Sequence, residues 1–235
     1  MTFTEHLEEL RRRLIYSVAA ILVTTLIAFF FSSYLLKFLL LPSGGMQLNA
    51  FSLMDGFMIK WRVSLLAGIV FAFPIWAYHT FRFIQPALQK NERKVIFPML
   101  VFSLVLFVLG TIFGYYLLWG MIRVMKGFYP PEVRYLPAAD DYISFVTFFL
   151  LACGLAFQLP TMMIILVQLK ILNTDVLRKQ RRIAYFALFV FAELITPVSD
   201  PIVAPLTVML PLVILYETSI LISRRIERRR VQAIA

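Results

Sequence analysis

The acidic residues that stand among arginines and lysines have the clearest capacity for binding chemistry. Glu9 precedes the run Arg11-Arg12-Arg13, and Glu92 lies beside Arg93 and Lys94. A carboxylate contributes nothing to the retention of a basic segment on the cytoplasmic side of a membrane. Two such carboxylates would select a ligand with fixed positive charge, and the planar fork of arginine binds carboxylates with paired hydrogen bonds. The sequence therefore predicts an acidic site for arginine, formed by Glu9 and Glu92 on a basic surface.

The same residues also fit an ordinary helix surface. Glu8 and Arg12 are four residues apart, as are Glu9 and Arg13, and this spacing gives ion pairs along one helix. Both interpretations stay open at this point.

Polar residues inside apolar segments form a second set of candidates. Gln158 lies near the middle of a long apolar segment beside Pro160, which frees the carbonyl of Ala156 and should kink the helix. Gln158 either satisfies that backbone or a neighbouring helix, or offers a polar contact to an incoming helix or peptide. Glu193 and Asp200 are further candidates for partner contacts, although Glu193 could instead snorkel to the membrane surface.

The elements that must position these residues are membrane helices. The 235 residues are 61% hydrophobic with a mean hydropathy of +0.83. Only helices or closed barrels can cross a bilayer, and the apolar runs here do not alternate as barrel strands do. We predict an all-α polytopic membrane protein, with residues 1–235 as one membrane domain and six spans at about 14–34, 64–83, 95–118, 142–169, 183–196 and 202–222.

The basic residues predict the orientation of these spans. Seventeen of the 23 lysines and arginines lie in the N-terminal segment, the C-terminal tail and two short connections, and six lie in two longer loops. This asymmetry places both termini in the cytoplasm. It also accounts for the net charge of +10, which in another context would suggest a nucleic-acid partner.

The last two predicted spans are short. About 14 residues separate Arg182 from Pro197, and they reach only about 21 Å as a helix, against about 30 Å of hydrocarbon. The next segment meets Glu217 after Tyr216. This hairpin either thins the bilayer locally or tilts against longer neighbours.

The two long loops should carry structure of their own. Residues 35–63 hold apolar side chains around Asp55 and predict short amphipathic helices, whereas prolines in residues 119–141 favour a stiff extended path. Asp140 and Asp141 stand where an N-cap of the fourth span would lie.

Nothing in the sequence indicates catalysis. No zinc-protease, nucleophile-elbow or phosphate-loop motif occurs, and Cys153 is the one cysteine. We expect no enzyme activity, no metal site and no cofactor. We also expect no cleavable signal peptide, because acidic residues precede an overlong first apolar run.

Four segments resemble motifs of the TatC family in the same order. They are His6-Leu-Glu-Glu-Leu-Arg-Arg-Arg-Leu14, Phe83-Ile-Gln-Pro-Ala-Leu-Gln-Lys-Asn-Glu-Arg93, Leu177-Arg-Lys-Gln-Arg-Arg182 and Thr196-Pro-Val-Ser-Asp-Pro201. The resemblance covers the whole chain and implies a receptor in the bacterial cytoplasmic (inner) membrane. Such a receptor binds twin-arginine signal peptides of folded precursor proteins and works with TatA- and TatB-like single-span partners under the protonmotive force.

The resemblance also implies roles for individual residues. Glu9 and Glu92 would accept the arginine pair, with Arg11 and Arg93 fixing the carboxylates or the loop. The apolar part of the site would be shaped by Phe83, Pro86 and Leu88. Gln158 departs from the pattern, because many relatives carry a glutamate there, and this puts in doubt any step that needs a titrating carboxylate at that point.

Three other function classes remain as alternatives. A secondary transporter would show repeats and broken helices around a midplane ion site, and the sequence indicates neither. A membrane-protein insertase could use a bare groove with one polar residue. An intramembrane enzyme lacks candidate nucleophiles. Dependence on a paired-arginine ligand separates the receptor from the transporter and the insertase.

Overall fold

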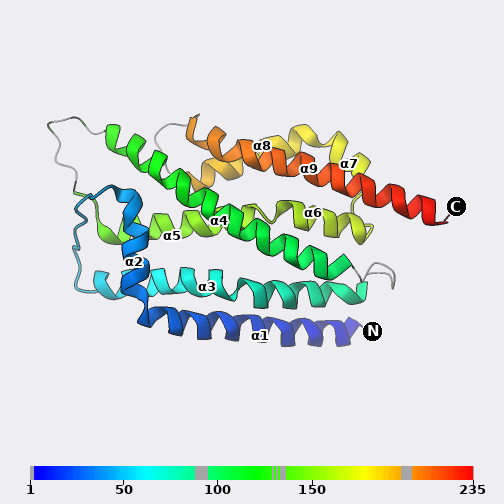
Figure 1. Cartoon of the computed structure of the whole chain (residues 1–235), viewed down its shortest axis with the longest axis horizontal. Helices are drawn as coiled ribbons and strands as arrows, with labels where there is room; N and C mark the ends of the chain where they lie inside the picture. Colours follow the sequence, from blue (N-terminus) through cyan, green and yellow to red (C-terminus); the bar gives the residue numbers. More distant parts are fainter. Residues whose placement is uncertain are drawn as a thin grey trace. The chain divides into compact units, whose positions relative to one another are not determined.

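Helices make up the regular structure of the described residues, which are 3–87, 95–128, 130, 132, 136–196 and 203–234 of the computed structural model (Figure 1). The α-helices are α1 (Phe3–Phe30), α2 (Ser32–Leu40), α3 (Asp55–Ile84), α4 (Ile96–Gly127), α5 (Ala139–Ala156), α6 (Leu159–Gln168), α7 (Thr174–Lys179), α8 (Arg181–Ile195) and α9 (Val203–Ile234). Two short 3-10 helices, η1 (Leu41–Ser43) and η2 (Gln85–Ala87), follow α2 and α3. The all-α prediction is confirmed.

Five helical segments of the described residues are long and apolar enough to cross a membrane. They are Thr4–Phe30, Asp55–Ile84, Ile96–Gly127, Ala139–Gln168 and Ala204–Glu227. They cover five of the six predicted spans. Helix α8, which covers the remaining one, has 15 residues and reaches about 22 Å, so a sixth crossing stays a prediction.

Helix α9 is longer than the last predicted span. It has 32 residues and continues through Glu217 to Ile234. A glutamate is a good helix former, so the charge at this position ends the apolar stretch without ending the helix. The shortness predicted for this span therefore applies to its apolar part alone.

The surfaces of the long helices are apolar, as lipid contact requires. Along α1 the exposed side chains include Leu14, Leu22, Leu26 and Ile27. Contiguous apolar surface of this extent is rare on proteins that face water. The exposed leucines and isoleucines of α1 therefore indicate contact with hydrocarbon.

The chain folds into two compact units. The first unit comprises Met1–Pro86 and Thr111–Leu151, and the second comprises Ala87–Gly110 and Ala152–Ala235. The boundaries at Gly110 and Leu151 fall inside α4 and α5, so each of these helices contributes to both units. The expectation of a single membrane domain stays a prediction.

Helices α1 and α3 pack along each other in the first unit (Figure 1). They approach closely at Gly68, where the Thr24 hydroxyl donates a hydrogen bond of 2.8 Å to the Gly68 carbonyl oxygen. A Cβ atom at Gly68 would lie 2.8 Å from the backbone N and Cα of Thr25. Small residues at helix crossings in membranes allow this proximity of backbones.

Gly68→Ala is therefore expected to destabilise the chain by about 1–3 kcal/mol, because the added methyl group would overlap the backbone of Thr25, which cannot move aside as a flexible side chain can. Gly120→Ala is the matched control, since a Cβ atom at Gly120 of α4 meets nothing within 4 Å. Alanine there should leave stability unchanged or raise it slightly. Thermal unfolding in detergent measures both variants, and equal midpoints for the two would contradict the expectation.

The first long loop contains two short helices, α2 and the 3-10 helix η1, and the residues that follow Asp55 belong to a span. Helix α2 lies at the start of the loop, but α3 begins at Asp55, so the apolar residues after Asp55 belong to its first turns. The Asp55 carboxylate accepts hydrogen bonds from the backbone N–H groups of Phe51 and Ser52, at 2.8 and 2.9 Å. These bonds fix the point at which the chain enters α3.

The second long loop also differs from its prediction. Helix α4 continues to Gly127, and Asp140 lies in the first turn of α5 and not at its N-cap. Asp140 pairs instead with Arg62 of α3, with Nη1 and Oδ1 2.6 Å apart. The extended path expected near Pro130 lies largely outside the described residues.

The second unit contains the kink predicted from Pro160. Helix α5 ends at Ala156 and α6 begins at Leu159, with Pro160 near its first position, where the missing N–H costs nothing. Helix α9 packs against α6, α7 and α8. The Tyr216 hydroxyl of α9 donates a hydrogen bond of 2.8 Å to the Leu177 carbonyl oxygen of α7.

Candidate functional site

Glu9 is held in place by an arginine one helical turn later. Its Oε1 atom accepts a hydrogen bond of 3.0 Å from Arg13 Nε and a second from Arg13 Nη2. The side chains of Glu9 and Arg13 are 10% and 15% exposed. The Oε2 atom of Glu9 is buried and has no hydrogen-bond partner among the described residues. The carboxylate thus combines a fixed orientation with unused acceptor capacity.

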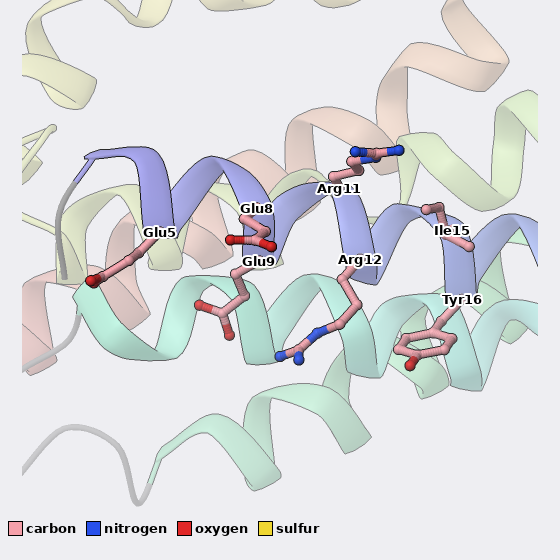
Figure 2. A pocket seen from close by; sticks show the side chains of 7 residues that line it. All are labelled: Glu5, Glu8, Glu9, Arg11, Arg12, Ile15 and Tyr16. Carbon is pink, nitrogen blue, oxygen red and sulfur yellow. The ribbon is translucent and has the colours of Figure 1, made fainter.

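A cleft of about 540 Å³ lies along this end of α1 (Figure 2). Its lining is Glu5, Glu8, Glu9, Arg11, Arg12, Ile15 and Tyr16. In Figure 2, Glu9, Arg12 and Tyr16 project to one side of α1. Along the cleft, the three carboxylates come first, the two guanidinium groups follow, and Ile15 and Tyr16 form the other end. Such a lining suits a peptide that carries positive charge next to apolar residues.

Aromatic contacts join this end of α1 to α3. The ring of His6 stacks on Phe83 with centroids 4.3 Å apart, and Tyr16 stacks on His79 at 5.6 Å. Phe83 is half-buried and Pro86, in η2, is half-buried as well. Sequence reasoning proposed Phe83 but missed His6 as its partner, because 77 residues separate them and nothing in the local spacing connects them.

The structure describes only some of the predicted site residues, and their role in binding stays a prediction. Glu9 and Arg11 line the cleft on α1, whereas Phe83 lies near the end of α3 and Pro86 lies in η2, outside that lining. Three predicted members, Leu88, Glu92 and Arg93, lie outside the described residues. Of the two predicted ion pairs on α1, Glu9–Arg13 forms, whereas Glu8 has no ion pair with any described residue.

Gln158 is bound to a neighbouring helix within the second unit. Its Oε1 atom accepts a hydrogen bond of 2.5 Å from the Ser103 hydroxyl, and its Nε2 atom donates one of 3.1 Å to the Ser103 carbonyl oxygen. Ser103 belongs to α4 and is buried. The two-sided contact uses both ends of the amide and joins α4 to the break between α5 and α6.

The two glutamates of the last helices have different surroundings. Glu193 of α8 is exposed on the surface of its helix, and it makes no ion pair with a described residue. Glu217 of α9 is bound to the preceding helix, α8. Its Oε2 atom accepts from Arg181 Nη2 at 2.6 Å and its Oε1 atom from the Tyr185 hydroxyl at 2.5 Å, both on α8. Asp200 lies outside the described residues.

Comparison with known proteins identifies the family. The model of the family "Sec-independent protein translocase protein (TatC)" matches residues 5–211. The chain is 35% identical to the TatC protein of Carboxydothermus hydrogenoformans, covering 97% of this chain and 94% of the relative. It is 34% identical to TatCy of Bacillus subtilis, over 97% and 91% of the two chains. The chain belongs to the TatC family.

A solved structure agrees with this assignment. The crystal structure described as the twin arginine translocase receptor TatC superposes with a TM-score of 0.80 at 32% identity, covering 93% of this chain and 98% of that one. The chain is thus a multi-pass membrane protein and a component of the twin-arginine, Sec-independent protein translocase.

Within this TatC fold, Gln158→Leu is expected to lower stability by about 1–2 kcal/mol, because it removes two hydrogen bonds between α4 and the helix break. Ser103→Ala should cost less, and the double variant should cost less than the two together. Met162→Leu, a similar-sized change at an exposed position, is the control. Thermal unfolding in detergent measures all four, and additive losses would show that the two side chains act independently.

Proposed function

We propose that the chain is the translocase subunit that receives twin-arginine signal peptides of folded precursor proteins. The observation that carries this proposal is Glu9, a carboxylate with one oxygen bound to Arg13 and the other buried and unused. When the Glu9 side chain turns so that Oε2 reaches the cleft, an arginine of the signal peptide supplies the missing donor and brings a charge that offsets the carboxylate. Lysine supplies a point charge without the planar fork, so it binds less well.

The other residues of the site shape and orient it. Arg11 is exposed at the cleft and limits how closely other cations approach, while Phe83 and Pro86 offer apolar surface at the end of α3. The resemblance to the TatC motifs assigns Glu92 as the second carboxylate, with Arg93 and Leu88 beside it. The apolar part of the signal peptide then follows the apolar surface of the spans.

We further propose six spans, with α8 as the fifth, and both termini in the cytoplasm of a bacterial cell. The distribution of lysines and arginines supports this orientation. With 15 residues, α8 crosses a membrane only where the bilayer is thinner than about 30 Å. The whole chain then forms one membrane domain around which oligomerising partners assemble.

TatA- and TatB-like single-span proteins are the proposed partners in transport driven by the protonmotive force. Glu193 is an available contact for them, because it is exposed and has no ion pair with a described residue. Asp200 is assigned to the same role from the sequence. Gln158 serves such a contact only if its hydrogen bonds to Ser103 open, so we give it a structural role in the resting state.

The hydrogen bonds of Gln158 argue against a secondary transporter, because they leave its amide unavailable to an ion. A broken helix, which that class predicts, does occur at the α5–α6 junction. Gln158, the polar side chain at this break, nevertheless has both ends of its amide hydrogen-bonded to Ser103. Among the described residues no group of three acidic, histidine or cysteine side chains gathers into a metal site.

Site-specific crosslinking tests the proposal. A photo-crosslinking residue replaces Glu8, which is exposed at the cleft, and the purified protein is mixed with a signal peptide that carries either two arginines or two lysines. We expect strong crosslinks to the arginine peptide, weak ones to the lysine peptide, and loss of both in the Glu9→Ala variant. Crosslinks that are indifferent to the arginines would contradict the proposal and favour the insertase or transporter class.

A further inference from the structure

A second cleft, of about 320 Å³, lies in the first unit among residues that the proposed function does not use. Helix α3 contributes Arg62, Leu65, Leu66 and Ile69, and α5 contributes Ser144, Thr147, Phe148 and Leu151. The cleft has one polar end, formed by an arginine and two hydroxyl groups, and is otherwise apolar. This arrangement matches an amphiphile with a charged head and a hydrocarbon chain.

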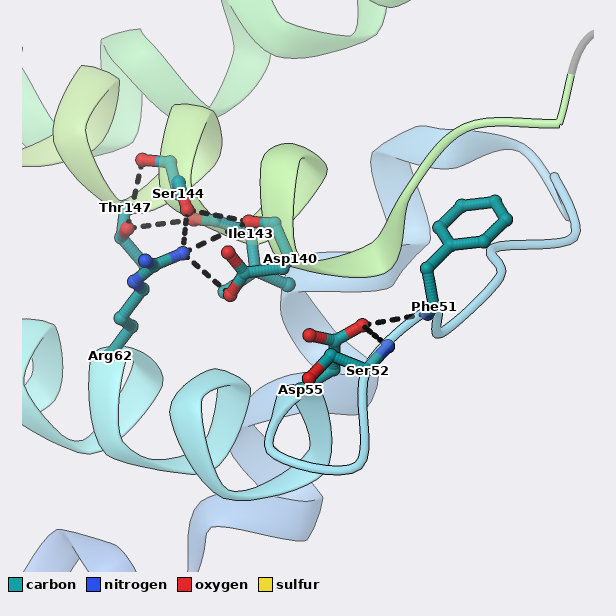
Figure 3. Close-up of polar contacts among 8 residues, drawn as sticks. All are labelled: Phe51, Ser52, Asp55, Arg62, Asp140, Ile143, Ser144 and Thr147. Atoms are coloured by element: carbon teal, nitrogen blue, oxygen red, sulfur yellow. Dashed lines mark hydrogen bonds and ion pairs between the residues drawn. The ribbon is translucent and has the colours of Figure 1, made fainter.

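The polar end is organised around Arg62 (Figure 3). Its Nη1 atom donates to the Ser144 hydroxyl and, at 3.3 Å, to the Asp140 carbonyl oxygen, and it lies 2.6 Å from Asp140 Oδ1. These contacts fix the guanidinium group. Its Nε and Nη2 atoms make no hydrogen bond or ion pair with the described residues, and the side chain is 37% exposed. Two donors of a fixed arginine therefore remain for a ligand.

The apolar part follows the helices into the hydrocarbon layer. Arg62 lies seven residues after the start of α3 at Asp55, and Ile69 lies seven residues further on. At 1.5 Å per residue, the cleft extends about 10 Å along the helix from its polar end. A transmembrane helix is about 10–12 Å wide with its side chains. A cleft of 320 Å³ spread over this length is too narrow for a helix and suits one hydrocarbon chain.

We propose that this cleft binds a zwitterionic aminophospholipid. The lipid phosphate accepts hydrogen bonds from Arg62 Nε and Nη2, the pairing for which the arginine fork is suited. The ammonium group lies beside the Asp140 carboxylate, which is 28% exposed. One acyl chain lies along Leu65, Ile69 and Phe148.

The charges select this headgroup over an anionic one. Arg62 and Asp140 already balance each other, so a headgroup with one positive and one negative charge leaves the site neutral. An anionic phospholipid would add a negative charge next to Asp140 without compensation. Like charges in a partly desolvated site repel each other strongly.

Native mass spectrometry of the full chain tests this site. The protein is delipidated in detergent and then incubated with equal amounts of phosphatidylethanolamine and phosphatidylglycerol. We expect at least fivefold more bound phosphatidylethanolamine, and at least a fivefold loss of it in Arg62→Gln and in Leu65→Trp. The first variant removes the headgroup donors, and the second fills the apolar part.

Lys60→Gln is the matched control, because Lys60 is exposed on the same helix and does not line the cleft. It should bind lipid as the unaltered chain does. Equal retention of the two lipids, or full retention in both cleft variants, would overturn the proposal. Soluble phosphoethanolamine that competes as well as the lipid would also overturn it, since the acyl chain would then have no role. Should Arg62→Gln fail to fold, Leu65→Trp and Ser144→Ala decide the question.

Discussion

Glu9→Gln is expected to weaken the binding of a twin-arginine signal peptide by roughly 30- to 150-fold, which corresponds to about 2–3 kcal/mol. Glu9 is only 10% exposed, so its pairing with arginine takes place largely out of water, where the loss of one charge is costly. The amide keeps the size of the side chain and one acceptor but removes the charge. Fluorescence anisotropy with a labelled peptide in detergent measures the change.

Glu8→Gln is the control for this variant. Glu8 lines the same cleft and the change removes the same charge, but Glu8 is exposed and has no ion pair with a described residue. Long-range attraction by an exposed charge is screened by salt, so this variant should bind within about threefold of the unaltered chain. Equal losses in Glu8→Gln and Glu9→Gln would mean that general acidity, and not a site at Glu9, attracts the peptide.

A double-mutant cycle between Glu9 and the arginines of the peptide tests whether these groups contact each other. Replacing both arginines of the peptide with lysines should weaken binding to the unaltered chain substantially. The same replacement should reduce peptide affinity only slightly in the Glu9→Gln background, because the carboxylate that discriminates arginine from lysine is then absent. Additive losses would place the arginines on other residues.

The features that the sequence predicted well are those fixed by local spacing. The apolar runs indicated the long helices, because length and hydropathy alone decide which segments suit a bilayer. Pro160 indicated the break between α5 and α6 through the geometry of one ring. The Glu9–Arg13 pair follows from the four-residue spacing on a single helix.

The contacts that the sequence did not predict join residues far apart in the chain. Ser103 and Gln158 are separated by 55 residues, and Arg62 and Asp140 by 78. Helical periodicity reports which face a residue shares with its own neighbours, and it carries no information on which other helix covers that face. Asp140 illustrates the difficulty, because an aspartate in a first helical turn is stabilised there whether or not an arginine lies opposite.

Glu217 joins α9 to α8 and leads to the second large expected effect. Glu217→Leu should destabilise the chain by about 2 kcal/mol, because it leaves Arg181 and the Tyr185 hydroxyl without their common acceptor. The estimate is moderate because Arg181 and Glu217 are 40% and 32% exposed. For a chain of this length, the thermal midpoint in detergent should fall by about 4–8 °C. Tyr185→Phe should cost less, and should cost nothing further in the Glu217→Leu background.

Glu193→Gln tests whether Glu193 of α8 contributes to the stability of the chain or to contact with a single-span partner. Glu193 is exposed and unpaired among the described residues, so its replacement should leave the thermal midpoint unchanged. If it contacts a single-span partner, the same variant should reduce copurification of that partner. A fall in the midpoint with Glu193→Gln would show that α8 depends on this residue for packing. An unchanged midpoint together with unchanged copurification would remove Glu193 from the partner surface.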